Sequence, residues 1–218
     1  GPFHRRRQRD AAPLVRRPPK GRHDVQDGQA GGGPGPRAAR PGEGEQTAPD
    51  YLVLNPQGLV PTLEDGEGGV LTQSLAIIEW LDETHPSPPL LPLDALQRAK
   101  ARAFALAIAC DIHPVQNLKV LARLRQLGVP DEKVTEWAAW ANREGLAACE
   151  ALVASEPGPF CFGEVPTIAD LCLVPQLANA RRFGVDVSAF PRLLKAEIAA
   201  KAMPAFADAA PDRQPDAE

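Results

Sequence analysis

The first 46 residues of this 218-residue chain contain no serine, threonine, tyrosine or cysteine, so any hydroxyl or thiol that the protein uses lies further along. Long apolar runs are also missing, and no stretch reaches the ~18–20 residues of a membrane span. The cysteines form no C-x-x-C pair, which indicates buried thiols of a reducing compartment rather than disulfides or zinc ligands. We therefore expect no membrane segment, no metal site and a cytosolic location. The four cysteines are Cys110, Cys149, Cys161 and Cys172.

Residues 1–48 contain nine arginines, nine glycines and seven prolines. Ordering a backbone costs about 1–2 kcal/mol per residue, and so few large apolar side chains cannot offset that cost. We predict a disordered arm. It carries ten Lys and Arg against five Asp and Glu, whereas the whole chain has a net charge of −4. The acidic remainder argues against nucleic acid as the main ligand, although the arm could hold phosphate weakly.

The chain begins Gly-Pro rather than with methionine, so we expect a fragment or a processed product. The arm has neither the apolar stretch of a secretory signal nor the composition of an amphipathic transit helix.

Residues 49–86 are predicted to form two strands followed by a helix. The segment 65–69 (DGEGG) marks a hairpin loop between strands near 59–63 and 70–71. Ser74 suits a helix N-cap, and this helix must stop before His85-Pro86.

From 92 to 208 the pattern predicts helices only. Apolar residues at three-four spacing predict one long helix, kinked at Pro114 and ended at Gly128. A second helix runs from a cap at Asp131 to Leu152, and a shorter one covers 193–201. Thr167 and Asp170 have the spacing of a capping box; residues 209–218 form a polar tail. The stripe expected to be buried in the long helix comprises Leu93, Leu96, Phe104, Ala107, Ile108, Ile112, Val120, Leu121, Leu124 and Leu127.

Four blocks carry a resemblance: residues 55–63 (NPQGLVPTL), 71–78 (LTQSLAII), 111–121 (DIHPVQNLKVL) and 166–183 (PTIADLCLVPQLANARRF). In this order they resemble the maleylacetoacetate isomerases, the zeta class of glutathione transferases. The resemblance implies an α/β plus all-α fold. An incomplete thioredoxin-like domain at 49–86 would precede an all-helical domain at 92–208.

The resemblance implies glutathione as cofactor. It gives Pro61 a cis peptide bond that presents the backbone of Val60 to an extended peptide. Gln73 and Ser74 would hold a glutathione carboxylate at a helix N-terminus, where free N–H groups and the dipole favour an anion, and Gln46 would be a further contact. From the residues alone, an ordinary turn at Pro61 and a plain N-cap at Ser74 remain open.

His113 and Asn117 are four residues apart on the predicted long helix, so they should face the same way, with Leu118 and Lys119 following one step round. The resemblance implies that these four line the cleft near glutathione and that Arg182 binds an acidic substrate. Ordinary solvated polar residues are the alternative reading.

The implied reaction is glutathione-dependent cis–trans isomerisation of maleylacetoacetate or maleylpyruvate, in a homodimer that serves the catabolism of tyrosine, phenylalanine or related aromatic acids. A catalytically silent binding or dimerisation module and a general glutathione transferase are the alternatives.

The family's N-terminal Ser-rich motif is absent, so no catalytic residue is identified and we expect impaired turnover. Residues 3–41 have the composition expected when GC-rich coding DNA is read in the wrong frame, and family-like sequence returns near Gly44. We hypothesise that a frameshift replaced the first strand, first helix and second strand. Resequencing the gene tests this hypothesis, and an uninterrupted frame that encodes the same arm would overturn it.

Overall fold

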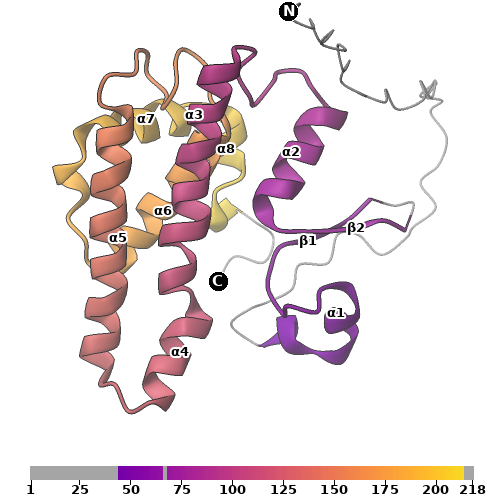
Figure 1. The fold of residues 1–218 in the computed structure, drawn as a ribbon, viewed down its shortest axis with the longest axis vertical. Helices are drawn as coiled ribbons and strands as arrows, with labels where there is room; N and C mark the ends of the chain where they lie inside the picture. Colours follow the sequence, from indigo (N-terminus) through magenta and orange to yellow (C-terminus); the bar gives the residue numbers. More distant parts are fainter. Residues whose placement is uncertain (1–43, 66–67, 214–218) are drawn as a thin grey trace, which may run out of the picture. The chain divides into compact units, whose positions relative to one another are not determined.

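The computed structural model describes residues 44–65 and 68–213 (Figure 1). Most of the predicted arm, residues 1–43, and the end of the polar tail, 214–218, lie outside them. The α-helices are α1 (Pro49–Leu54), α2 (Ser74–Thr84), α3 (Ala95–Leu106), α4 (Leu118–Gln126), α5 (Asp131–Val153), α6 (Ile168–Arg182), α7 (Pro191–Lys201) and α8 (Pro204–Asp208). The strands are β1 (Thr62–Glu64) and β2 (Val70–Thr72). Short helical segments are η2 (Glu45–Thr47), η3 (Ala107–Ile112, a π-helix), η4 (Pro114–Gln116), η5 (Val187–Ala189) and η6 (Pro211–Arg213).

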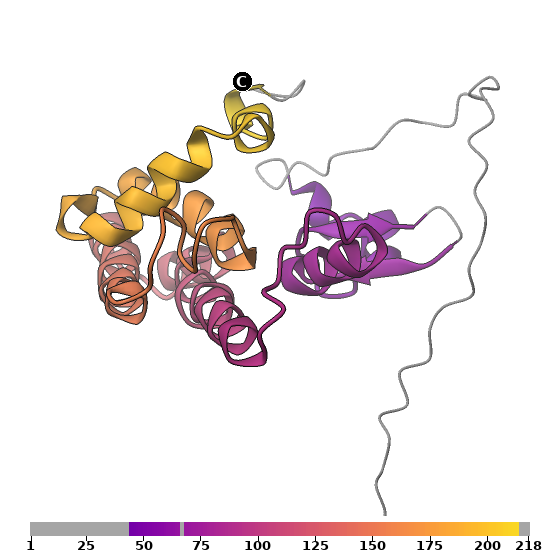
Figure 2. The same ribbon diagram turned by 90° about the horizontal axis from the view of Figure 1, so that it is seen from above.

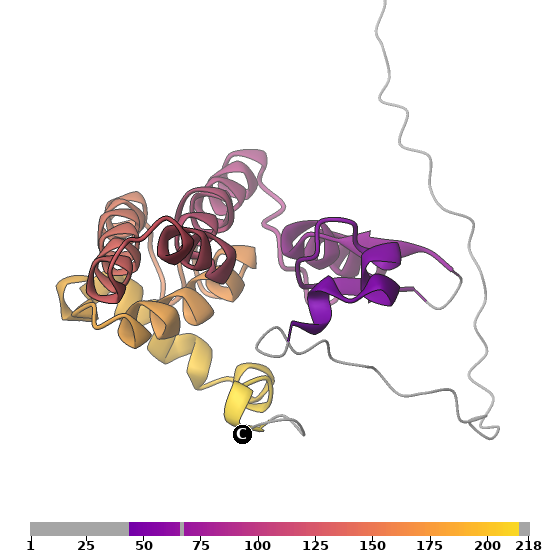
Figure 3. The ribbon, with the colours of Figure 1, turned by 90° about the horizontal axis from the view of Figure 1, so that it is seen from below.

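The predicted hairpin is confirmed. β1 and β2 are antiparallel and Leu63 pairs with Leu71. Figure 2 shows α2 in front of the hairpin and Figure 3 shows α1 on the opposite side, so the two strands lie between these helices. Within 44–65 and 68–84, only Asn55 and Ile77 are buried. Because a two-stranded sheet is marginal by itself, this segment needs contacts with the helices that follow.

Helix α1 is a feature that the sequence analysis missed. The Tyr51 hydroxyl donates to the Leu59 carbonyl at 2.7 Å and lies 2.9 Å from the Thr62 hydroxyl oxygen. Asn55 donates its side-chain N–H to the same Leu59 carbonyl at 2.6 Å. These bonds fix the chain just before β1.

Connections to the helical part run through α2 and the segment after it. Arg102 of α3 holds the Glu79 carboxylate with two hydrogen bonds of 2.9 Å, and Ile168 donates its N–H to the Leu90 carbonyl at 3.1 Å. The described residues group into one unit, so the division into domains at 49–86 and 92–208 remains a proposal.

The prediction of one kinked helix through Pro114 is wrong. α3 widens into the π-helix η3, in which His113 donates its N–H to Ile108. Proline has no N–H and crowds the carbonyl of the preceding turn, so an ordinary α-helix cannot continue through it. Asn117 is extended, with φ −62° and ψ 148°, and a separate helix α4 begins after it.

The core of the helical part is only partly the predicted stripe. Phe104, Ile108 and Ile112 are buried. Leu93 and Leu96 are 91% and 65% exposed, and Leu93 precedes α3, which begins only at Ala95. Gly145 allows α5 to approach η3, since a Cβ there would lie 2.3 Å from the Ile112 side chain.

Helix α6 is central, because it contacts α3, α5 and α7. The predicted capping box at its start is confirmed. The buried Asp170 carboxylate accepts hydrogen bonds from the Thr167 N–H and from the Cys161 N–H, both at 2.8 Å. It therefore holds the preceding loop against the helix.

Three smaller predictions need correction. Asp131 is the first residue of α5 rather than its cap, since Pro130 is the N-cap, and η2 orders part of the segment assigned to the arm. Cys110 is exposed, whereas Cys149 and Cys161 are buried as expected.

No helix among the described residues is long and apolar enough to cross a membrane, and no group of residues in that part of the chain could hold a metal ion.

We expect Asp170→Ala to lower the free energy of unfolding by about 3 kcal/mol, because it leaves two buried backbone N–H groups without an acceptor. Urea denaturation followed by circular dichroism measures this. The matched control is Asp131→Ala, which removes an exposed carboxylate paired with Arg125 and should cost less than about 1 kcal/mol. Equal losses in the two variants would contradict the role given to Asp170.

Candidate functional site

Val60 lies in a bend just before β1, and its backbone groups are free among the described residues. Its peptide bond to Pro61 is cis, as predicted. The preceding Leu59 carbonyl is held by Tyr51 and Asn55. Neither the N–H nor the C=O of Val60 is bonded to another described residue, and the residue is 46% exposed. The fold thus fixes this segment and leaves one donor and one acceptor available to a ligand.

Gln73, and not Ser74, is the N-cap of α2. Its φ of 73° is the only positive φ of a non-glycine residue in the described ranges. Such a backbone conformation is unfavourable for side-chain-bearing residues and is concentrated at functional sites. Gln73 takes the non-helical position, so Ser74 becomes the first helical residue, and the prediction of Ser74 as N-cap is wrong by one position.

The N-terminus of α2 is open. Within the described part of the chain no side chain accepts a hydrogen bond from its first turn, and that turn contains no acidic residue. Unpaired N–H groups and the positive end of the helix dipole therefore face whatever binds there, an arrangement that favours a carboxylate.

The predicted residues of this segment come together at one end of the hairpin. Thr62 pairs with Thr72, so Val60 and Gln73 lie at the same end of the two strands. The side chain of Gln73 donates to Gln57 at 2.8 Å. We call Gln46, Val60, Gln73 and Ser74 the hairpin cluster.

Gln46 packs against the same loop. Its backbone oxygen lies 3.3 Å from the position that a Cβ on Gly58 would occupy. Its side-chain Oε1 is buried and accepts no hydrogen bond from the described residues. An amide oxygen without a donor is suited to accept a hydrogen bond from a ligand.

A second group, the turn cluster, consists of His113, Asn117, Leu118 and Lys119. Asn117 accepts a hydrogen bond from the Lys119 N–H at 3.0 Å and caps α4. The prediction that His113 and Asn117 share one helical face is therefore wrong, since the helix ends between them. Both still lie on one short turn, and Leu118 is 52% exposed.

His113 is an exposed residue of that turn whose ring is partly covered by the neighbouring chain. Desolvation by the surrounding chain lowers its pKa from the ordinary value. The neutral imidazole is therefore favoured, and it can donate or accept a hydrogen bond near neutral pH.

Arg182 is exposed in the last turn of α6. Its neighbour Arg181 pairs with Glu197, whereas Arg182 pairs with none of the described carboxylates. Phe183, the next residue, packs in a small core with Leu121 of α4, so Arg182 is carried on the end of α6 that adjoins α4.

No hydrogen bond or ion pair between described residues joins the hairpin cluster to the turn cluster. Sequence reasoning missed Tyr51, Gln57 and Trp137, which support these two clusters through contacts 8 to 22 residues away in the chain. Pairings at such separations give no local pattern in a sequence.

Comparison with known proteins gives two family matches. The glutathione S-transferase N-terminal domain matches residues 38–84, and the glutathione S-transferase C-terminal domain matches residues 141–196. The chain is 49% identical over 173 residues to a maleylacetoacetate isomerase of Pseudomonas aeruginosa, in an alignment that covers 79% of this chain and 81% of the relative. It is 44% identical over 178 residues to a maleylpyruvate isomerase of Ralstonia sp, covering 80% and 84%.

A solved structure of maleylacetoacetate isomerase from Methylobacterium extorquens AM1, with bound malonate and glutathione, is also similar. The identity is 40% and the TM-score 0.78, over 82% of this chain and 85% of that chain.

We expect NMR to find that His113 titrates below the ordinary value of about 6.5. The unfolded chain then binds more protons than the folded one just below pH 6.5, so the free energy of unfolding should fall as the pH drops through that window. His113→Gln should remove this part of the pH dependence. The same ring in the urea-unfolded chain is the reference, and an equal or higher pKa in the folded protein would contradict the desolvation.

Proposed function

We propose a glutathione-dependent isomerase function for this chain, because it belongs to the maleylacetoacetate isomerase family, the zeta class of glutathione transferases. The reaction converts the cis double bond of a maleyl acid, maleylacetoacetate or maleylpyruvate, into the trans double bond of the fumaryl isomer. The observation that carries the proposal is the open N-terminus of α2 next to the free backbone of Val60.

The residues of the hairpin cluster fit glutathione. The open helix start at Gln73 and Ser74 suits the γ-glutamyl carboxylate. The N–H and C=O of Val60 suit the backbone of the cysteinyl residue, in the manner of an added strand. The buried Oε1 of Gln46 lacks a donor within the described residues, and a ligand N–H would satisfy it.

Glutathione, when bound, supplies a thiol that adds reversibly to the conjugated double bond and so permits rotation about it. Three thiols of the chain itself are poorly suited to this role. Burial raises the pKa of Cys149 to about 12 and that of Cys172 to about 11, and burial and then Asp170 raise that of Cys161. These groups stay protonated at neutral pH, so they are weak nucleophiles.

The turn cluster and Arg182 suit the acidic substrate. Lys119 and Arg182 are exposed cations that form no ion pair with the described residues, and maleyl acids carry carboxylates that such groups attract. Neutral His113 and the Asn117 side chain add hydrogen-bonding groups, and Leu118 adds an apolar surface. The relative solved with malonate and glutathione binds a small dicarboxylate, which supports this assignment.

We also propose that this chain catalyses the isomerisation more slowly than a family member that has the N-terminal Ser-rich motif. A free thiol has a pKa near 8.5, and the sequence lacks the family's N-terminal Ser-rich motif, which would stabilise the thiolate. Removal of a comparable oxyanion donor costs about 2.7–4 kcal/mol, which is about a hundredfold or more in rate. A cytosolic location, a homodimer and a role in tyrosine and phenylalanine catabolism belong to the same proposal and rest on family membership.

We expect Ser74→Asp to abolish most glutathione binding while the fold is retained. A carboxylate in the first turn is favourable to the helix, but it repels the ligand carboxylate, which should weaken binding at least about tenfold. Isothermal titration calorimetry with glutathione measures the affinity, and urea denaturation measures the stability. Ser155→Asp, at an exposed position after α5, adds the same charge and serves as the control.

An unchanged affinity in Ser74→Asp would sink the assignment of α2 as the carboxylate site. Activity on maleylpyruvate compared with conjugation of chlorodinitrobenzene separates an isomerase from a general transferase. A chain that binds no glutathione would contradict the proposal as a whole and leave the silent module as the better reading.

A further inference from the structure

The break between η3 and α4 leaves the Val115 carbonyl without a helical partner among the described residues. In a continuous α-helix the Val115 carbonyl would accept from the N–H four residues later, that of Lys119. Here Lys119 donates instead to the Asn117 side chain at 3.0 Å. Within the turn itself, the N–H of Asn117 reaches only the Pro114 carbonyl, at 3.4 Å, which is long for a hydrogen bond.

Trp137 of α5 satisfies that carbonyl. Its indole Nε1–H donates to the Val115 oxygen at 2.9 Å, across a separation of 22 residues. The Trp137 ring also packs against Trp140, with ring centroids 5.4 Å apart. One side chain thus joins the long helix α5 to the turn that carries His113, Asn117, Leu118 and Lys119.

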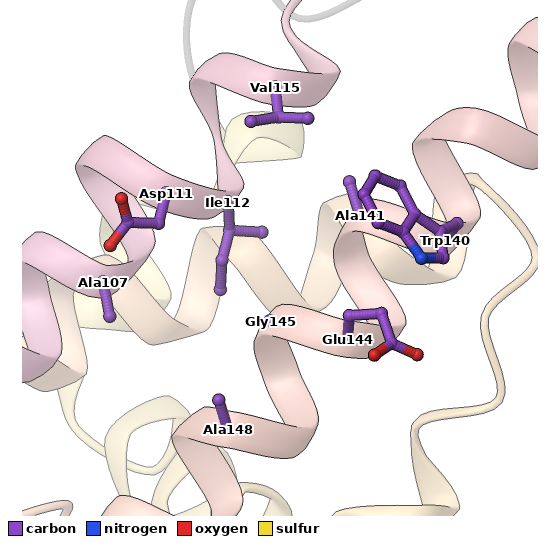
Figure 4. Close-up of a pocket in the computed structure, with 9 residues that line it drawn as sticks. All are labelled: Ala107, Asp111, Ile112, Val115, Trp140, Ala141, Glu144, Gly145 and Ala148. Atoms are coloured by element: carbon purple, nitrogen blue, oxygen red, sulfur yellow. The ribbon is translucent and has the colours of Figure 1, made fainter.

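A pocket borders the turn on the side next to Trp140. Figure 4 shows Val115 and Trp140 lining a pocket together with Asp111 and Glu144, so empty space separates the turn from α5 there. Pro114 contributes no N–H, and the buried Nε2 of Gln116 finds no acceptor among the described residues. Because the turn has few internal bonds, the hydrogen bond from Trp137 helps to fix its orientation, together with the packing of η4 on α5.

We propose that Trp137 is a positioning residue of the ligand site: its hydrogen bond to Val115 sets the orientation of the turn cluster toward glutathione and the substrate. This inference rests on the proposed function. Trp137 acts through the backbone and does not itself touch the ligand.

The sharpest test replaces the indole N–H and keeps the ring. Trp137→Phe removes the donor, and substitution of Trp137 by 3-benzothienylalanine replaces the N–H by sulfur in a ring of nearly the same shape. Trp140→Phe is the control, since Trp140 packs on Trp137 but makes no hydrogen bond to a described residue. Calorimetry with glutathione gives the affinity, and NMR of the ligand-free protein gives the His113 pKa and the amide shifts of residues 113–119.

Both Trp137 variants should bind glutathione about three- to tenfold more weakly, the effect of one lost hydrogen bond, and Trp140→Phe should stay within about twofold. In the ligand-free variants the amide shifts should change mainly at 113–119, and the His113 pKa should move toward its ordinary value.

Wild-type affinity in the benzothienyl variant, or equal losses in Trp137→Phe and Trp140→Phe, would overturn the positioning role while the proposed function stands. Absence of glutathione binding by the wild-type protein would overturn both.

Discussion

Asp170 accepts hydrogen bonds from the backbone of Thr167 and Cys161 in the interior of the helical part, and the placement of α6 follows from these bonds. Asp170 lies in the first turn of α6, and α3, α5 and α7 all pack against this helix. The next residue after the cap, Ile168, bonds the Leu90 carbonyl, which ties the segment after α2 to the same point. One buried carboxylate therefore organises both the helical core and its link to the hairpin.

The two clusters of candidate site residues share one structural feature. Each lies at the N-terminal end of a helix, α2 or α4, where the preceding backbone is not helical. At α2 the interruption is the positive φ of Gln73, which leaves the first turn without a cap. At α4 it is Pro114 followed by Asn117, whose side chain supplies the cap. The first start is open to a carboxylate, and the second presents side chains from a short turn. The candidate residues thus gather at the N-terminal ends of α2 and α4.

Local signals in the sequence predicted a large part of this arrangement. The hairpin followed from its glycine-rich loop, the capping box from the spacing of Thr167 and Asp170, and the helical succession from apolar periodicity. The family resemblance supplied the fold and the cofactor, which no periodicity could have given. All of these depend on residues that are close in the chain or on blocks of characteristic sequence.

Features set by distant contacts were not predictable in this way. The break at Pro114 was read as a kink, because a pattern of apolar residues continues on both sides of it. Leu93 fits the spacing of the buried stripe, but it precedes the first turn of α3 and its side chain is exposed. The donation from Trp137 to Val115 spans 22 residues, so no local pattern in the sequence indicates it. Periodicity records which side chains are apolar, but not which carbonyl lacks a partner.

The unequal burial of the four cysteines has a practical consequence for chemical labelling. Cys149 and Cys161 are buried, Cys172 is half-buried, and Cys110 is exposed. A maleimide fluorophore or a nitroxide spin label would thus react first at Cys110 in the unmodified protein. That position lies in η3, three residues before His113, so the natural sequence already carries an attachment point for a spectroscopic probe beside the turn cluster.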